Sequence, residues 1–310
     1  MNYKHINTIL ALMLMMFVSC REEDEIMIHT PNDAINLTAT IGPAPTRVSQ
    51  IGDNQYEFSP GDTICVVGWT GSDRACPQPW ETDERWWINS LNVFNGSKWT
   101  ATPYMRWQNG EGIVHNFVSW WPTNLASATE DNLFSISHTA SNAYNPDILV
   151  AKESLVRPAN NSITLNFHHL LSRFDVHLQF TEDYKEISSI EVTANAVVDA
   201  ILNLVEGTST CGSTTATLPI IEKLATNGAY WSGSLIVIPQ TMSNAHIGIS
   251  FQADGTSYNL SYVHPSLNFT SGKFTTLTLI ISKDKVKVAG VEISPWNDST
   301  SLGDVDAEEI

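Results

Sequence analysis

Histidine, cysteine and carboxylate side chains are the groups that could carry chemistry in this chain, and their spacing matches no familiar catalytic or metal-binding pattern. There is no GxSxG nucleophile turn, GxGxxG or P-loop phosphate motif, EF-hand loop, CxxC pair or HExxH motif. The adjacent pair His168-His169 is the strongest candidate for a metal site. Because neighbouring side chains of a strand point to opposite faces, we expect a structural role for both imidazoles. The sequence therefore predicts no catalytic residue, no metal, no cofactor and no enzymatic activity, although paired glycosidase carboxylates cannot be identified without geometry.

Cys20 has a context that predicts covalent modification. Lys4 and His5 open the chain, an apolar run follows from Ile9 to Val18, and Ser19 precedes the cysteine. This order is typical of a secretory signal, and the run is shorter than the roughly 20 apolar residues that a membrane-spanning helix needs. A cysteine directly after the small residue resembles a bacterial lipoprotein signal, although Phe17 replaces the usual leucine. We expect residues 1–19 to be the signal peptide and Cys20 to carry the lipid (palmitate); an ordinary signal with an incidental Cys20 is the alternative.

Residues 20–33 are expected to form a flexible acidic tether, because the run after Cys20 contains Glu22, Glu23, Asp24 and Glu25. Its composition resembles the export signal of surface lipoproteins in Bacteroidetes. Together with Cys20, the tether predicts a protein anchored by lipid at the outer membrane and exposed on the cell surface.

Three further cysteines remain, Cys65, Cys76 and Cys211. A disulfide between Cys65 and Cys76 fits an oxidising compartment, and three separate thiols are an equally good interpretation.

Composition favours strands and excludes one class of partner. The 310 residues carry a formal net charge of −17, from 33 acidic against 16 basic residues, and only 16% of them are charged. An acidic surface repels phosphate backbones, so we expect no nucleic-acid partner. Long amphipathic helices normally carry more charged residues, so the composition indicates strands and turns.

Alternation of apolar and polar residues predicts many short strands. The first such run places Ile35, Leu37, Ala39 and Ile41 on one face. A later run is expected to turn Phe174 and Val176 inward and Asp175 outward. About a dozen such strands, with no fixed repeat, favour two β-sandwich domains. We expect an N-terminal domain over residues 34–170, a C-terminal domain over 171–298 and a loose acidic tail over 299–310.

Six tryptophans lie between residues 69 and 107, and three of them, Trp80, Trp86 and Trp87, are expected in a long loop over residues 70–87. Exposed tryptophans can stack on sugars or fill a protein pocket, so these three are candidate contacts to a host protein or glycan. The alternative is that the tryptophans cover the thin core of a β-sandwich.

Several spaced motifs together resemble one family. They are Thr46-Arg47, Phe58-Ser59-Pro60-Gly61-Asp62-Thr63-Ile64, Phe117-Val118-Ser119-Trp120-Trp121-Pro122, Asp147-Ile148-Leu149-Val150-Ala151, Phe167-His168-His169-Leu170-Leu171-Ser172-Arg173-Phe174, Pro239-Gln240, Ser271-Gly272-Lys273-Phe274 and Ile293-Ser294-Pro295-Trp296. With the lipoprotein start, their order is similar to that of the fimbrillins of Bacteroidales, the major and minor fimbria subunits.

This resemblance implies an all-β fold of two tandem antiparallel β-sandwich domains with transthyretin-like, Greek-key topology. It implies a structural or adhesive subunit of fimbriae that assembles with other fimbrial subunits. It further implies that an Arg-specific protease cuts after Arg47 and removes the strand Ile35–Ile41, so that the next subunit donates a strand in its place. A plain exposed arginine is the alternative for Arg47, and a glycan-binding outer-membrane lipoprotein of a polysaccharide-uptake system is the alternative function.

Overall fold

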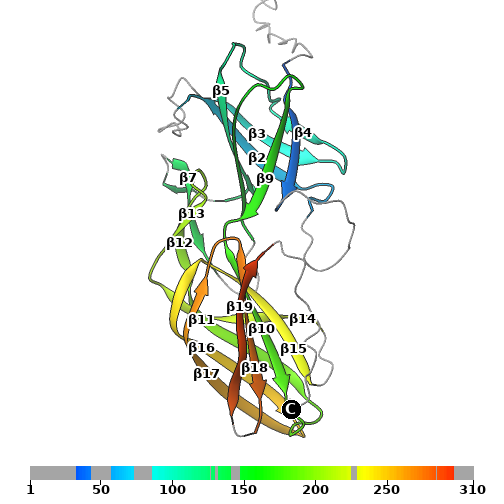
Figure 1. The fold of residues 1–310 in the computed structure, drawn as a ribbon, viewed down its shortest axis with the longest axis vertical. Helices are drawn as coiled ribbons and strands as arrows, with labels where there is room; N and C mark the ends of the chain where they lie inside the picture. The colour runs from blue at the N-terminus through cyan, green and yellow to red at the C-terminus, as the bar shows by residue number, and fades with distance from the viewer. Residues whose placement is uncertain are drawn as a thin grey trace, which may run out of the picture.

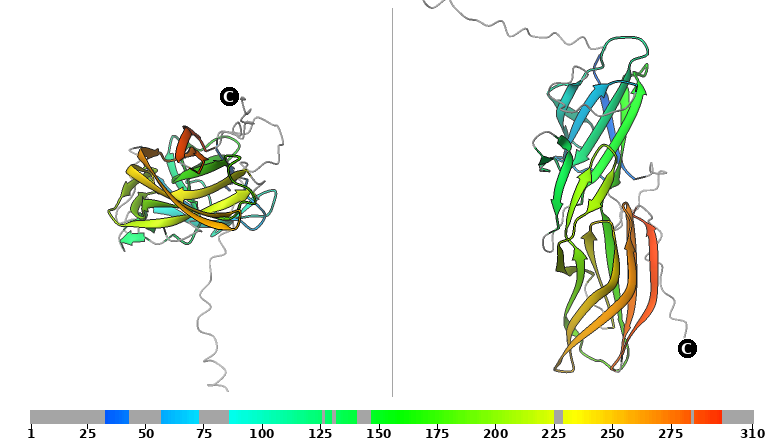
Figure 2. Two further views of the ribbon diagram at one scale, coloured as in Figure 1. Left: turned by 90° about the horizontal axis from the view of Figure 1, so that it is seen from below. Right: turned by 90° about the vertical axis from the view of Figure 1, so that its left-hand side faces the viewer.

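The chain is built from β-strands. The computed structural model describes residues 33–42, 57–72, 86–125, 127–129, 132–140, 147–224, 229–283 and 285–296. They form 19 strands in three sheets, which confirms the all-β prediction. Across these ranges there is no helix that could cross a membrane. Figures 1 and 2 show an elongated molecule, with one large sheet toward one end and another toward the opposite end.

The first large sheet has seven strands, and most of its pairs are antiparallel. In spatial order they are β1 (Asn36–Ile41), β9 (Ser162–His169), β8 (Leu149–Val156), β5 (Val114–Trp121), β2 (Thr63–Thr70), β3 (Trp86–Phe94) and β4 (Trp99–Thr102).

The second large sheet has eight strands and lies at the other end of the molecule (Figure 1). Its order is β17 (Thr256–Phe269), β16 (Gln240–Ala253), β11 (Ser188–Val197), β14 (Thr215–Leu224), β15 (Tyr230–Val237), β10 (Ser172–Phe180), β18 (Lys273–Ile281) and β19 (Val286–Pro295). Side chains of all these strands contribute to or pack on one hydrophobic cluster, so the sheet curves around its core.

A third, four-stranded sheet joins segments that lie far apart in the sequence. Its order is β13 (Thr208–Cys211), β12 (Asp199–Asn203), β7 (Asn132–Thr139) and β6 (Ser127–Thr129). β12 pairs with β7 in antiparallel register, from Asp199 opposite Thr139 to Asn203 opposite Ser135. Strand pairing therefore crosses residue 170, where the sequence suggested a division between domains.

Two pairings depart from the expected antiparallel sheets. β1 is parallel to β9, and β10 is parallel to β18. Parallel neighbours need a long connection. Both pairs meet this condition, since seven strands separate β1 from β9 in the chain and seven separate β10 from β18.

The seven-stranded sheet is buried on both faces, because two separate clusters cover it. Val66 and Phe117 belong to the cluster on one face, and Val67 and Val118 belong to the cluster on the other. The second cluster includes residues of β7 and β12, which places the four-stranded sheet over this face. Consequently, six consecutive residues are buried in both β2 and β5, and buried residues do not alternate with exposed ones.

Candidate functional site

Strand β1 forms one edge of the seven-stranded sheet and confirms the first strand expected from the sequence. Among the described strands it pairs with β9 alone, in register from Asn36 opposite Ser162 to Ile41 opposite Phe167. Within the described ranges, the other backbone edge of β1 makes no ladder, and a single bridge joins Ala34 to Arg106. β1 is therefore held by one ladder of backbone hydrogen bonds, whereas the central strands of this sheet have two.

The apolar side chains of β1 lie over the core. Ile35, Leu37, Ala39 and Ile41 are half-buried and pack on the cluster that contains Ile163, Leu165 and Phe167 of β9, whereas Asn36 and Thr38 are exposed. Complete burial of one leucine or isoleucine side chain stabilises a fold by about 1.5–3 kcal/mol, so these half-buried side chains contribute less. Removal of β1 would expose both this apolar surface and the free edge of β9.

Both ends of β1 are fastened by further contacts. The Trp107 backbone NH donates to the Asp33 carbonyl at 2.8 Å, and the Ile35 NH donates to the Met105 carbonyl at 3.2 Å. At the other end, the Gly42 NH donates to the Phe167 carbonyl at 2.7 Å. Because Met105 and Trp107 follow β4, these hydrogen bonds attach the residues before β1 to the segment that follows β4.

Several sequence-predicted features lie outside the described residues. They are the signal peptide 1–19, Cys20, the tether up to residue 32, Arg47, Cys76, Trp80 and the tail 299–310. Arg47 follows Gly42, the last described residue of its segment, by five positions. Lipidation of Cys20 and cleavage at Arg47 therefore stay predictions.

Four of the motifs that suggested the family meet where the two large sheets join. The ring of His169, at the end of β9, stacks on the ring of Trp296, which follows β19, and His169 Nδ1 lies 2.5 Å from Asp147 Oδ2. The Trp296 NH donates to the Gly272 carbonyl at 3.0 Å, and the Gly272 NH donates to the Leu171 carbonyl at 2.9 Å. Gly272 has φ +67°, a left-handed conformation that glycine adopts without strain.

The two adjacent histidines point to opposite sides, as their strand position predicts. His169 is buried, whereas His168 is half-buried and near Lys152, since a Cβ added at Gly207 would contact both side chains. The parts of the chain that the structure describes contain no group of three His, Cys, Asp or Glu side chains placed to hold a metal ion.

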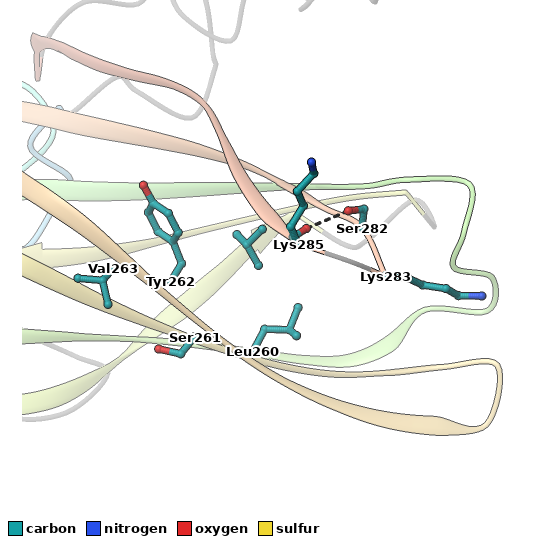
Figure 3. A pocket seen from close by; sticks show the side chains of 8 residues that line it. Leu260, Ser261, Tyr262, Val263, Ser282, Lys283 and Lys285 are labelled. Atoms are coloured by element: carbon teal, nitrogen blue, oxygen red, sulfur yellow. Dashed lines mark hydrogen bonds between the residues drawn. The ribbon is translucent and has the colours of Figure 1, made fainter.

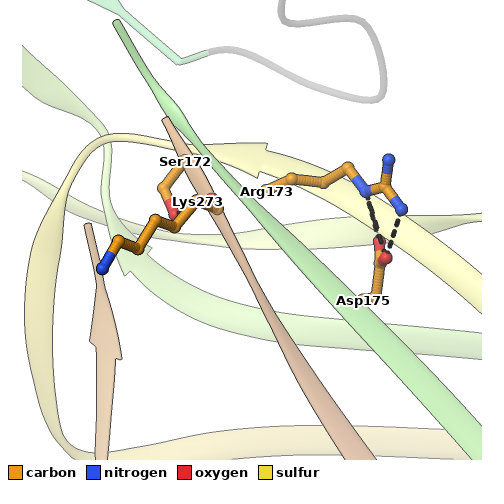
Figure 4. Close-up of polar contacts among 4 residues, drawn as sticks. All are labelled: Ser172, Arg173, Asp175 and Lys273. Carbon is orange, nitrogen blue, oxygen red and sulfur yellow. Dashed lines mark hydrogen bonds and ion pairs between the residues drawn. The ribbon is translucent and has the colours of Figure 1, made fainter. Parts of the chain in front are cut away.

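A buried ion pair on β10 corrects one detail of the sequence interpretation. Asp175 does not face solvent; its carboxylate accepts hydrogen bonds from Arg173 Nε at 2.8 and 3.0 Å, and both side chains are buried (Figure 4). The guanidinium also lies 5.1 Å from the ring centroid of Phe274. The two residues are two apart on one strand, which places them on the same face. An arginine and an aspartate two residues apart in a predicted strand were the sequence pattern that could have indicated this ion pair.

The two described cysteines, Cys65 and Cys211, are less reactive than exposed thiols. Cys65 is buried, its Sγ lies 3.9 Å from Asn89 Oδ1, and burial raises the pKa of its thiol to about 12. Cys211 is half-buried, and burial and then the charge of Asp199 raise its pKa. Since Cys76 lies outside the described residues, its pairing with Cys65 stays a prediction.

The described tryptophans of the aromatic stretch mainly serve the core. Trp69 and Trp107 are buried, and Trp99 is half-buried against Phe58 at 5.1 Å between ring centroids. The expectation that Trp86 and Trp87 lie in the loop was wrong, because both residues begin β3. A ligand-binding role for Trp80, Trp86 and Trp87 stays a prediction.

Comparisons with solved structures support the fold. A candidate cell adhesion protein from Bacteroides ovatus ATCC 8483 is similar over 86% of this chain and 99% of its own, with a TM-score of 0.61 and 17% identity. A candidate cell adhesion protein from Bacteroides uniformis ATCC 8492 is similar over 85% and 98%, with a TM-score of 0.54 and 19% identity. At such identities the likeness concerns the fold alone.

Sequence comparison identifies the family. No functionally curated protein matches the sequence. The model of the fimbrillin-like family, in contrast, matches residues 46–296, which is most of the chain. The chain therefore belongs to the fimbrillin-like family.

Proposed function

We propose that this chain is a structural or adhesive subunit of cell-surface fimbriae that assembles by exchange of strand β1. Its family is one of fimbrial and adhesive structural proteins of the cell surface. In this proposal two tandem β-sandwich domains of transthyretin-like, Greek-key topology form the subunit, and lipid on Cys20 anchors it to the outer membrane. Its partners are other fimbrial subunits.

The placement of β1 is the observation that carries the proposal. β1 is an edge strand held by one parallel ladder, and its alternate side chains Leu37, Ala39 and Ile41 cover an apolar core together with Ile35, which directly precedes the strand. A strand removed from such a place leaves unpaired backbone groups on β9 and an apolar groove, and an extended segment from another chain satisfies both. Because Gly42 ends the described segment five residues before Arg47, a cut after Arg47 would separate β1 covalently from the rest of the sheet.

Processing decides which role the subunit has. A chain that is cut after Arg47 loses its lipid together with β1 and can join a polymer. A chain that keeps β1 stays lipidated and acts as an anchor. Glycan uptake is the weaker alternative, since the described tryptophans mainly pack in the core.

An in vitro processing experiment tests the proposal. The purified full chain is treated with an Arg-specific protease, and the new N-terminus and the oligomeric state are measured by mass spectrometry and size-exclusion chromatography. We expect Val48 as the new N-terminus, release of the fragment that contains β1, and oligomers that form only after release. The variant Arg47→Gln, in which every other arginine remains, is the matched control and should keep β1 and stay unassembled. Oligomers in which every chain keeps the Cys20–Arg47 segment would exclude strand exchange.

A further inference from the structure

Strand β19 forms one edge of the eight-stranded sheet, and most of it is exposed. Among the described strands it pairs with β18 alone, and the right-hand view of Figure 2 shows it as the outermost strand along one side of its sheet. Eight of its ten positions are exposed, and they include Val288, Val291 and Ile293 at 38%, 42% and 44%. An edge strand with exposed branched side chains favours pairing with another extended strand.

The pairing with β18 defines which side chains of β19 share a face. Directly opposite residues of an antiparallel pair lie on the same face of a sheet. Four fully buried residues of β18 lie on the core face, and each has an apolar partner in β19. The pairs are Thr275 with Ile293, Leu277 with Val291, Leu279 with Val288 and Ile281 with Val286. These four side chains of β19 therefore extend the core face to the edge of the sheet.

A β-bulge brings Val288 and Val291 onto this same face, although they are three positions apart. Their partners Leu277 and Leu279 are only two positions apart, so β19 contains one residue more than β18 at this point. The extra residue is Ala289, which has no opposite partner in β18. Lys287, in contrast, lies on the other face of the sheet, because it stands opposite Ile280.

The sequence of β19 is complementary to itself in the antiparallel direction. From Val286 to Ile293 it reads apolar, Lys, apolar, small, small, apolar, Glu, apolar. When a second copy is aligned in the opposite direction, with Ala289 opposite Gly290, the other pairs are Val286 with Ile293, Lys287 with Glu292 and Val288 with Val291, and each pair occurs twice. In a regular strand the two members of each pair would lie on opposite faces, whereas the bulge places them on the same face.

Charge selects this register. Lys287 and Glu292 are exposed, and within the part of the chain that the structure describes neither belongs to an ion pair. Glu292 accepts a hydrogen bond from Ser294 Oγ at 3.0 Å, which holds its carboxylate beside the strand. Opposite charges directly across two strands stabilise their pairing, and like charges destabilise it. A lysine and a bulge normally protect an edge strand, but a second copy supplies the glutamate that this lysine needs.

A pocket beside the start of β19 leaves its apolar face accessible. The pocket has a volume of about 280 Å³ and separates β17 from the turn between β18 and β19 (Figure 3). It is lined by residues 260–263 of β17 and by Ser282, Lys283, Lys285 and Val286. Val286 packs partly on the core, whereas the three apolar residues that follow it on this face are exposed. β17 therefore leaves room for another apolar surface against the core face of β19.

We propose that β19 is a binding surface for a second copy of this chain. The two β19 strands pair in antiparallel direction about a two-fold axis at Ala289 and Gly290, and the two eight-stranded sheets become continuous. The apolar side chains of both strands cover one another on the core face, and Lys287 of each copy pairs with Glu292 of the other on the outer face. Because both copies use the same edge, the contact closes on itself and gives a dimer, not a polymer.

This dimer does not depend on cleavage at Arg47 or on the exchange of β1, which belongs to the other large sheet. The uncut full chain, which keeps β1, is therefore used in every sample. A dimer that forms only after cleavage at Arg47 would belong to the exchange of β1 and would overturn the pairing of β19.

Charge-reversal variants test the pairing of Lys287 with Glu292. We expect sedimentation equilibrium of the full chain to show monomers and dimers in a ratio that depends on concentration. Lys287→Glu and Glu292→Lys alone should each raise the dimer dissociation constant at least about tenfold, because each turns two attractive pairs into repulsive ones. An equimolar mixture of the two variants should dimerise again, since each copy then supplies the charge that the other copy lacks.

Two exposed residues on turns of the seven-stranded sheet provide matched controls. Lys98→Glu, before β4, and Glu111→Lys, before β5, change the net charge as the two test variants do and should leave the dimer unchanged. A full chain that is monomeric at every concentration would overturn the proposal. A dimer that neither reversal in β19 weakens, or a mixture that does not restore dimerisation, would overturn it as well.

Discussion

The imidazole ring of His169 stacks face to face on the indole ring of Trp296, with ring centroids 4.1 Å apart and ring planes 3° apart. The two residues are 127 positions apart in the sequence. The contact therefore attaches the end of the last strand, β19, to the end of β9, where the chain passes from one large sheet to the other. Asp147, whose Oδ2 lies 2.5 Å from His169 Nδ1, orients the imidazole for this stack.

Trp296→Ala should lower the free energy of unfolding by about 3–5 kcal/mol, because it opens a cavity at a fully buried position and removes the stack. Urea unfolding followed by circular dichroism measures the change. Trp99→Ala, at a half-buried tryptophan, is the control and should cost clearly less. A loss below about 1 kcal/mol for Trp296→Ala would contradict a structural role for the junction.

The sequence motifs that form this junction could be recognised from the sequence, but their contact in the folded chain could not. Phe167 to Phe174, Ser271 to Phe274 and Ile293 to Trp296 were recognisable pieces with a familiar order. Their convergence depends on the parallel pairing of β10 with β18, and a parallel pair leaves no local turn signal in the sequence.

The strands illustrate the same limit. The alternation of Ile35, Leu37, Ala39 and Ile41 identified β1 because one face of that strand is buried and the other exposed. It did not reveal β9 as the partner. The pairing of β12 with β7 was also missed, because short strands carry few alternating positions and their partners lie in a distant segment. The alternation along β10 separated Asp175 from the apolar face of Phe174, but it did not reveal that Asp175 is buried and paired with Arg173.

The two described thiols should react at very different rates. At pH 8 we expect iodoacetamide to modify Cys211 in the native chain and to leave Cys65 protected, because the Cys65 thiol is buried and its pKa is raised to about 12. Mass spectrometry of tryptic peptides gives both rates, and Cys211→Ser is the control for assignment.

The same labelling examines the predicted disulfide. After unfolding without a reductant, Cys65 should become fully modified if it is a free thiol. Persistent protection of both Cys65 and Cys76, relieved by reduction, would establish a bridge between them.

Stability should fall as the pH is lowered through the range in which histidines titrate. Burial lowers the pKa of His138 below its ordinary value of 6.5, so the folded state holds this imidazole neutral. A group whose pKa is lower in the folded than in the unfolded state contributes its full stability above the unfolded pKa. Below that pH the unfolded state binds the proton more readily, and stability falls by up to about 1.4 kcal/mol per pH unit.

Urea unfolding at pH 7.5, 6.5 and 5.5 measures this effect in the wild-type chain and in His138→Gln. The difference in unfolding free energy between the two proteins should shrink or change sign as the pH falls, because glutamine does not titrate. A constant difference across the three pH values would show that His138 does not contribute.

Gly233 of β15 tests how tightly the curved eight-stranded sheet is packed. A Cβ at this position would meet the indole ring of Trp231 and lie 2.8 Å from the Ile221 carbonyl oxygen of the neighbouring strand β14. The backbone oxygen cannot move without disturbing the ladder, so Gly233→Ala should destabilise the chain by about 1–3 kcal/mol. Gly290→Ala in β19 is the matched control, because no described atom lies within 4 Å of its added Cβ, and its effect should stay within about 0.5 kcal/mol. Equal unfolding free energies for the two variants would show that the backbones of β14 and β15 can move apart at Gly233. That result would contradict tight packing between these two strands.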